Sequence, residues 1–162
     1  TSFRLMIQRI QSIYMLLAVI LCGLTYFFPL SLVVGEAGNA GNALTLTACT
    51  VSGEVAGESV SGTPFGIAVL LLATIVIVLT AIFKYKRRKV QIRLLNMAMA
   101  CLLLCYVAGI AYTWVWSSRV SEGHAAITPY ALLPLAAYLC LWFARRGVRH
   151  DEALVAAADR LR

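Results

Sequence analysis

Cysteine side chains offer the first chemistry that this sequence could perform. Cys101 and Cys105 lie one helical turn apart, a spacing at which two thiols can share a metal ion or take part in redox exchange. No His or carboxylate shares their apolar segment, and the same holds for Cys22 and Cys140. Cys49 stands alone in a polar segment, so it cannot build a disulfide framework. A thiol-redox enzyme is therefore one hypothesis, but we expect no metal site and no cofactor.

The same cysteines also belong to series of small residues. Residues at four-residue spacing lie near one face of a helix, and small side chains there let two membrane helices approach closely. We predict that two such series pack against neighbouring helices. They are Cys101, Cys105, Gly109 and Thr113 in one apolar segment, and Ala136, Cys140 and Ala144 in another.

Other candidates for catalysis are few. His124 lies near Glu122 and Arg119 in a short polar segment, but a loop histidine needs a positioned partner before it can act as a base. Serine is abundant, yet the sequence has no Gly-x-Ser-x-Gly motif. We predict no catalytic residue, and we expect that the protein is not an enzyme.

Polar side chains at the borders of the apolar segments allow two interpretations. Gln and Asn can join helices by interhelical hydrogen bonds, whereas the same side chains beside Arg can bind anionic lipid headgroups or an acidic partner. We keep both interpretations. The candidate docking residues are Gln8, Arg9, Gln11, Arg87, Arg88, Gln91, Arg93, Asn96, Leu154 and Leu161.

The elements that must position these residues are apolar. The chain has 162 residues, of which 61% are hydrophobic and 13% are charged, with a mean hydropathy of +0.84. Soluble domains are about half apolar and about a quarter charged, so a bilayer is the expected solvent. Helices of about 20 apolar residues cross a bilayer. The expected spans are 13–34, 65–83, 94–116 and 129–144.

These spans predict an all-α fold, an integral membrane four-helix bundle that forms a single domain over 1–162. None of the four contains Asp, Glu, Lys, Arg or His, which argues against a pump or an ion-coupled transporter. A channel lined by backbone or hydroxyl groups stays open as an alternative.

The expected connections are two outer loops, 35–64 and 117–128, and a basic cytoplasmic loop, 84–93. Within the first loop, Leu44 to Val51 partly alternates apolar and polar residues, which permits a short strand or hairpin. That segment alone is too small to bury a face. The tail 151–162 begins with acids and ends with bases around an apolar face, so we predict a short amphipathic helix on the cytoplasmic surface.

Charge gives the expected orientation. Of fourteen Lys and Arg, all but Arg119 precede the first span, separate the second from the third, or follow the fourth. The positive-inside rule then predicts that both termini are cytoplasmic. The net charge of +7 is explained by this placement, and we expect no nucleic-acid partner.

Three segments carry a resemblance to a known family. They are Met6-Ile7-Gln8-Arg9-Ile10-Gln11-Ser12-Ile13-Tyr14, Lys89-Val90-Gln91-Ile92-Arg93-Leu94, and Asp151-Glu152-Ala153-Leu154 followed by Asp159-Arg160-Leu161-Arg162. The chain resembles an uncharacterised family of four-span inner-membrane proteins of Bacteroidota, classed as a domain of unknown function. The resemblance implies a bacterial cytoplasmic membrane and no particular reaction.

Three functions follow as hypotheses. The first is a non-enzymatic accessory or scaffolding subunit that acts through its cytoplasmic face, with membrane lipid and another membrane or cytoplasmic protein as partners. The alternative is a small-solute or lipid transporter or channel built from two helical hairpins. The third is the thiol-redox membrane enzyme.

Overall fold

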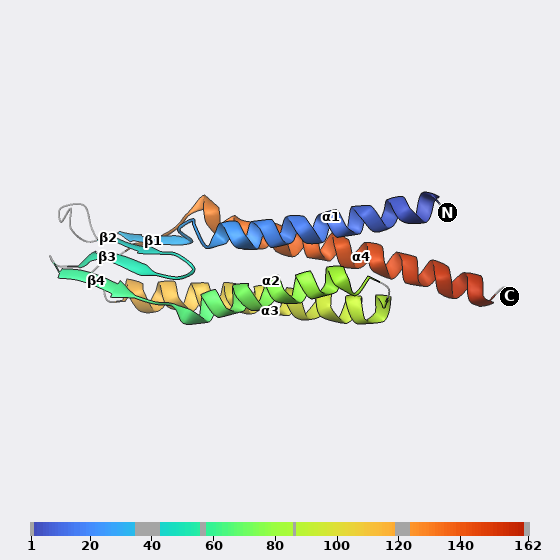
Figure 1. Ribbon diagram of the computed structural model, residues 1–162. Coiled ribbons are helices and arrows are strands. Elements are labelled where there is room, and N and C mark those ends of the chain that lie inside the picture. The colour runs from blue at the N-terminus through green and yellow to red at the C-terminus, as the bar shows by residue number, and fades with distance from the viewer. Residues whose placement is uncertain (1, 35–42, 56–57, 86, 119–123, 161–162) are drawn as a thin grey trace.

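The long apolar segments form helices, and the polar connections on one side of them form strands, in the computed structural model shown in Figure 1. The structure describes residues 2–34, 43–55, 58–85, 87–118 and 124–160. The described helices are α1 (Ser2–Thr25), α2 (Phe65–Phe83), α3 (Arg88–Ser117), the short 3-10 helix η1 (Pro129–Ala131) and α4 (Leu132–Arg160). Both termini lie at one end of the elongated body, the terminal end, and the strands lie at the other, the sheet end.

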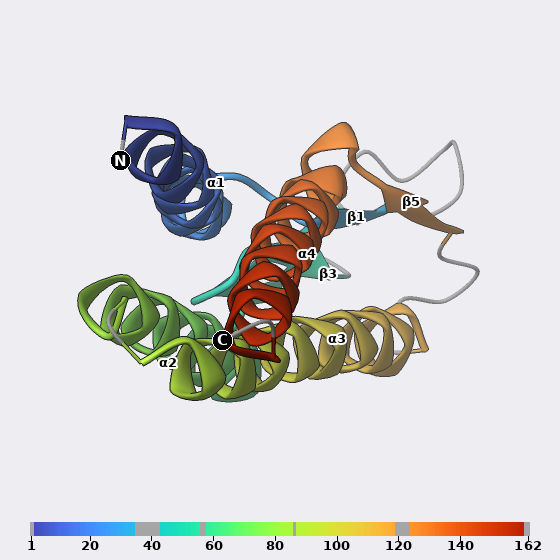
Figure 2. The same cartoon turned by 90° about the vertical axis from the view of Figure 1, so that its right-hand side faces the viewer.

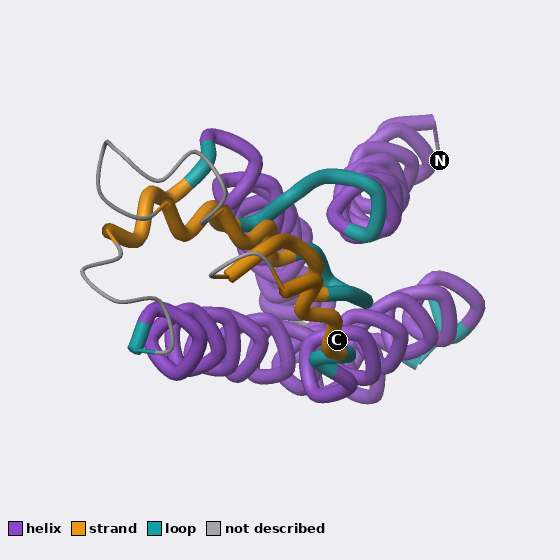
Figure 3. Tube along the Cα trace, turned by 90° about the vertical axis from the view of Figure 1, so that its left-hand side faces the viewer, coloured by secondary structure: helices purple, strands orange, loops and turns teal. Residues whose placement is uncertain are grey.

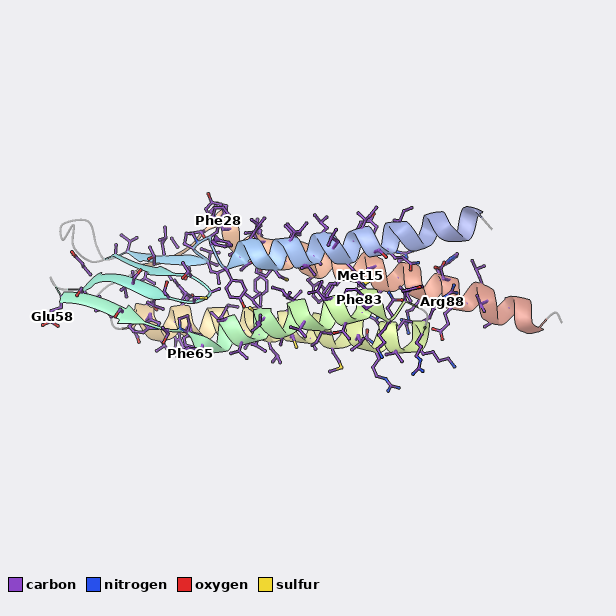
Figure 4. All side chains as sticks on the ribbon, viewed as in Figure 1. Met15, Phe28, Glu58, Phe65, Phe83 and Arg88 are labelled. Atoms are coloured by element: carbon purple, nitrogen blue, oxygen red, sulfur yellow. The ribbon has the colours of Figure 1, made fainter. Side chains whose placement is uncertain are left out.

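The four long helices form a ring of antiparallel neighbours. Viewed from the terminal end, α1 and α4 lie above α2 and α3 (Figure 2). The most extensive contacts are those of α1 with α4 and of α2 with α3, and contacts of α1 with α2 and of α3 with α4 close the ring. The interior is apolar and fully buried, with Met15, Leu71, Leu95, Leu102 and Leu141 from all four helices. Figure 4 shows Met15 between α1 and the lower pair of helices.

The sheet shows that the expected all-α fold was wrong. The five strands are antiparallel, in the order β4-β3-β2-β1-β5. They lie across the end of the helices (Figure 3). The strands are β1 (Ser31–Val34), β2 (Ala43–Leu46), β3 (Val51–Val55), β4 (Glu58–Gly62) and β5 (His124–Ile127).

The sheet forms because two connections far apart in the chain combine. The hairpin of β2 and β3 falls where alternation permitted strands, but its own surface is too small to be stable. Strand β1 pairs with β2 on one side and with β5 on the other, which enlarges the sheet and the surface that it can bury. Val33 and Leu44 then bury one face together with Trp116 of α3.

The first helix begins and ends earlier than the expected span 13–34. It ends at Thr25, and the amides of Tyr26 and Phe27 complete a turn by donating to the carbonyls of Gly23 and Leu24, at 3.1 and 3.0 Å. Pro29 follows, which has no N–H and disfavours a helical residue before it. Residues 31–34, assigned to the span from their apolarity, are therefore free to form β1.

Two other expected boundaries are also corrected. Helix α3 begins at Arg88, so most of the expected loop 84–93 is helical. Helix α4 is continuous from Leu132 to Arg160, so the expected separate tail helix is the last part of the fourth long helix. No proline or glycine interrupts the chain between 148 and 160, which lets the helix continue. Residues 161–162 lie outside the described part of the chain.

Among the described residues, three helices are long and apolar enough to cross a membrane. Two of these apolar helices are α2 and α3, and the third runs from Pro129 to Ala157 and contains most of α4. The apolar part of α1, Ile10–Thr25, is shorter than these. The protein is thus mostly helical, with three candidate membrane spans and an antiparallel sheet.

Candidate functional site

At the terminal end, side chains from three helices meet in a buried polar cluster. Gln11 Nε2 donates a hydrogen bond of 2.7 Å to Asp151 Oδ2, and Arg88 Nη1 donates one of 3.0 Å to the Asp151 carbonyl oxygen. Gln11 and Gln91 are only 6% and 5% exposed. Figure 4 shows Arg88 beneath α4 at this end. We call Gln11, Arg88, Gln91 and Asp151 the polar cluster.

The polar cluster holds helices together and leaves almost no space for a ligand. The Gln91 amide lies 3.7 Å from the Met15 sulfur, so α3 contacts α1 here as well. The cavity among these residues, which Tyr85 and Val148 also line, has a volume of about 10 Å³. A single water molecule needs roughly that much space. The structural interpretation of Gln11 and Gln91 therefore agrees with their geometry.

Gly147 allows α4 to approach α1 closely at this point. A Cβ atom at Gly147 would lie 3.0 Å from Gln11 Cγ and 3.1 Å from Gln11 Nε2. Because the Gln11 side chain is buried and bonded to Asp151, it cannot move aside without losing that hydrogen bond.

Exposed cations surround the polar cluster. They come from the turn between α2 and α3, from α3 and from α4, and Figure 4 shows side-chain nitrogen atoms around Arg88 at the terminal end. We call them the cationic face. The Arg146 guanidinium also lies 5.7 Å from the centre of the Trp142 ring, a cation–π distance. The exposed cations are Lys84, Arg87, Lys89, Arg93, Arg146 and Arg149.

The remaining docking candidates are dispersed. Asn96 and Leu154 are exposed, and neither is part of the polar cluster. The side chains of Gln8 and Arg9 lie outside the described part of the chain, as does Leu161. Of the predicted docking residues, Gln11, Arg88 and Gln91 thus belong to the polar cluster. Its fourth member, Asp151, was not among the predicted docking residues.

Only some members of the two small-residue series face the core of the helix bundle. The buried face of α3 runs through Gln91, Leu95, Ala98, Leu102 and Cys105. A strict four-residue spacing drifts about 40° per step around a helix of 3.6 residues per turn. Beyond Cys105 the series therefore leaves the core.

Gly109 and Thr113 illustrate this drift. A Cβ atom at Gly109 would have no heavy atom within 4 Å, so the expected close helix contact is absent there. Thr113 instead faces the sheet, where its hydroxyl lies 2.9 Å from Ser31 Oγ.

The other members of the series divide between the core and partial exposure. Cys101, Ala136 and Cys140 are partly exposed, and Ala144 is fully buried. On α4 the core face consists of Ala137, Leu141, Ala144 and Val148, one position away from most of the predicted series.

An apolar pocket lies where α3 and α4 meet the sheet. Its volume is about 380 Å³, and it opens to the outside. We call it the apolar pocket. The sequence did not predict it, because its walls come from β1, β2, α3, β5, η1 and the start of α4. Its lining residues are Leu30, Ser31, Leu46, Cys105, Tyr106, Gly109, Ile110, Thr113, Trp114, Ser117, Ala125, Ile127, Ala131 and Pro134.

The cysteines lie in different surroundings and do not gather with His, Asp or Glu within the described ranges. All five cysteines are free thiols, with Cys22 and Cys105 buried and Cys49 exposed. Within the described ranges, no three His, Cys, Asp or Glu side chains come close enough together to hold a metal ion. The backbone of His124 forms part of β5, opposite Val34.

Comparison with known proteins identifies a family. A family model described as "Domain of unknown function (DUF4293)" matches residues 7–161, so the chain belongs to that family. No curated protein matches the chain significantly.

The close approach at Gly147 generates a prediction. We expect Gly147→Leu to push α4 away from Gln11 and to lower the free energy of unfolding by about 1–3 kcal/mol, the usual cost of overpacking. Reversible denaturation in detergent measures the change. The matched control is Gly23→Leu, because a Cβ atom at Gly23, unlike one at Gly147, meets nothing within 4 Å. Equal stability of the two variants would contradict the assigned α1–α4 contact.

Proposed function

We propose that this family member crosses the cytoplasmic membrane of a bacterium of the Bacteroidota four times, with both termini in the cytoplasm. We further propose that it is a non-enzymatic accessory or scaffolding subunit, and that it acts through the cationic face.

The lengths of the helices support four crossings. The apolar part of helix α1, Ile10–Thr25, corresponds to about 24 Å, and the aromatic Tyr26, Phe27 and Phe28 that follow it extend the apolar segment toward the roughly 30 Å of a hydrocarbon core. Large apolar side chains on the outside of the ring are exposed on every helix, among them Ile20, Leu72, Leu104 and Leu139. Such an extensive apolar surface is unusual in water but is solvated by lipid tails.

The unequal distribution of charge supports the orientation. The cationic face lies at the terminal end, whereas the exposed charged side chains of the described strands are Glu54 and Glu58. Figure 4 shows Glu58 at the far tip of the sheet end. Basic residues favour the cytoplasmic side, so the sheet end is the outer end in this proposal.

The observation that carries the scaffolding role is the cationic face itself. Its six side chains come from separate elements, and hydrogen bonds between Gln11, Arg88 and Asp151 fix those elements relative to one another. Cations on elements that are held together keep their positions relative to one another. This favours binding of an acidic protein surface or anionic headgroups.

A transporter is a second candidate because of the apolar pocket. However, the bundle interior between the pocket and the terminal end is filled by fully buried side chains such as Leu95, Leu102 and Leu141. A path through it would require the helices to separate, and close packing opposes that.

The proposed orientation predicts the labelling of thiols. In cells stripped of any outer barrier, a membrane-impermeant maleimide should label the exposed Cys49. A cysteine introduced as Lys89→Cys, with Cys49→Ser, should react only after the membrane is permeabilised. The reverse pattern, protection of Cys49 with labelling at position 89, would invert the proposed orientation.

The proposed role predicts that a protein can be cross-linked at the cationic face. A photo-reactive amino acid at Arg93 should capture a protein in native membranes, whereas the same group at Glu58 should not. Combining Arg87→Gln, Lys89→Gln and Arg146→Gln should reduce capture several-fold, because the attraction is electrostatic.

The matched control for the charge variant is Glu54→Gln together with Glu58→Gln, which alters exposed charges at the sheet end. We expect normal capture from this control. If Arg93 captures only lipid, or if the triple variant captures as well as the unaltered chain, the scaffolding role is wrong.

A further inference from the structure

We infer that the apolar pocket binds the acyl chain of a bilayer phospholipid at the outer surface of the membrane. This inference rests on the proposed membrane placement, but it concerns a different end of the molecule and a different ligand from the scaffolding role.

The size and walls of the pocket suit a hydrocarbon chain. Its volume of about 380 Å³ falls within the range of roughly 300–1,000 Å³ that small-molecule pockets occupy. Gly109 contributes to this space, since a Cβ atom there would meet nothing within 4 Å. A larger side chain at this position would fill the pocket.

The hydroxyl groups in the walls already donate hydrogen bonds within the protein. Thr113 Oγ1 donates to the Gly109 carbonyl at 2.8 Å, so the Ser31 hydroxyl is the donor in their shared hydrogen bond. Ser117 Oγ donates to the Trp114 carbonyl at 2.8 Å, and the Tyr106 hydroxyl donates to the Ala131 carbonyl. A polar ligand would lose its hydration without gaining a hydroxyl donor here, whereas a hydrocarbon chain has no hydrogen bonds to lose.

The mouth of the pocket is continuous with the surface that faces lipid. Trp114 and Ile127 at the mouth are each 77% exposed, and Ile110, one turn before Trp114, is also exposed. Figure 2 shows the end of α3 and strand β5 on the same side of the molecule. Trp114 and Trp116 close the third span, and tryptophan favours the level of the headgroups. A chain can therefore enter the pocket sideways from the bilayer while its headgroup stays at the surface.

Photo-cross-linking in a bilayer tests this inference. The protein is reconstituted in vesicles of phosphatidylethanolamine and phosphatidylglycerol with a trace of phospholipid that carries a diazirine near the end of one acyl chain. After illumination, mass spectrometry locates the adducts. We expect adducts on the inner wall, at Ser31 and Cys105, which are only 4% and 3% exposed, as well as on outward-facing residues such as Ile20.

Variants separate the pocket from general contact with lipid. Gly109→Leu should lower the inner-wall adducts several-fold and leave those at Ile20 unchanged. Ala125→Phe narrows the mouth from β5 and should act in the same direction, so a folding defect in one variant does not remove the test. The control Gly23→Leu should change neither set of adducts.

Each remaining outcome has a definite meaning. Adducts at Ile20 without inner-wall adducts, or inner-wall adducts that persist in both pocket variants, would refute acyl-chain binding while leaving the membrane placement intact. No adduct anywhere would refute the proposed membrane placement itself.

Discussion

The first and last helices lie side by side, and this contact determines where the other elements can lie. Rings of Tyr14 and Phe143 stack with centroids 6.0 Å apart along the helices, and rings of Phe28 and Tyr130 stack at 4.6 Å where the helices meet the sheet (Figure 4). At the terminal end, Gln11 bonds to Asp151 across 140 residues of sequence. Closing so long a loop costs conformational entropy, and contacts spread along the whole interface offset it.

At the sheet end, backbone pairing between strands holds the segments next to α1 and α4 together. Strand β1 follows α1, strand β5 precedes α4, and they pair with each other. The Thr128 hydroxyl also donates to the carbonyls of Pro29 and of Leu30, the latter at 2.9 Å. Unpaired backbone groups near a bilayer are costly, so the antiparallel sheet satisfies both connections together.

This arrangement explains why the two ends have different surfaces. The terminal end is held by hydrogen bonds among Gln11, Arg88 and Asp151, so its outer side chains are free to be cationic. The sheet end is held by backbone pairing, which leaves a space between flat strands and round helices. That space is the apolar pocket, whose walls come from two layers that do not fit closely together.

The sequence predicted local features better than distant pairings. The second apolar run coincides with α2, because length and apolarity are local properties. The pairing of β1 with β5 joins segments about ninety residues apart, and no local pattern encodes it. Gln11 and Gln91 were singled out because glutamine at the border of an apolar run can join helices by hydrogen bonds, whereas Asp151 resembled an ordinary helix start. The pocket could not be predicted, since its lining residues come from six elements that are far apart in the chain.

Disulfide trapping in vesicles tests most directly whether the chain closes on itself through β1 and β5. In a variant without native cysteines, Leu32→Cys and Ala126→Cys stand directly opposite each other in the sheet. Mild oxidation should join them rapidly within one chain. The pair Leu32→Cys and Ala125→Cys should not react, because adjacent strand residues point to opposite faces. Equal reaction of both pairs, or reaction of neither, would contradict the pairing of β1 with β5.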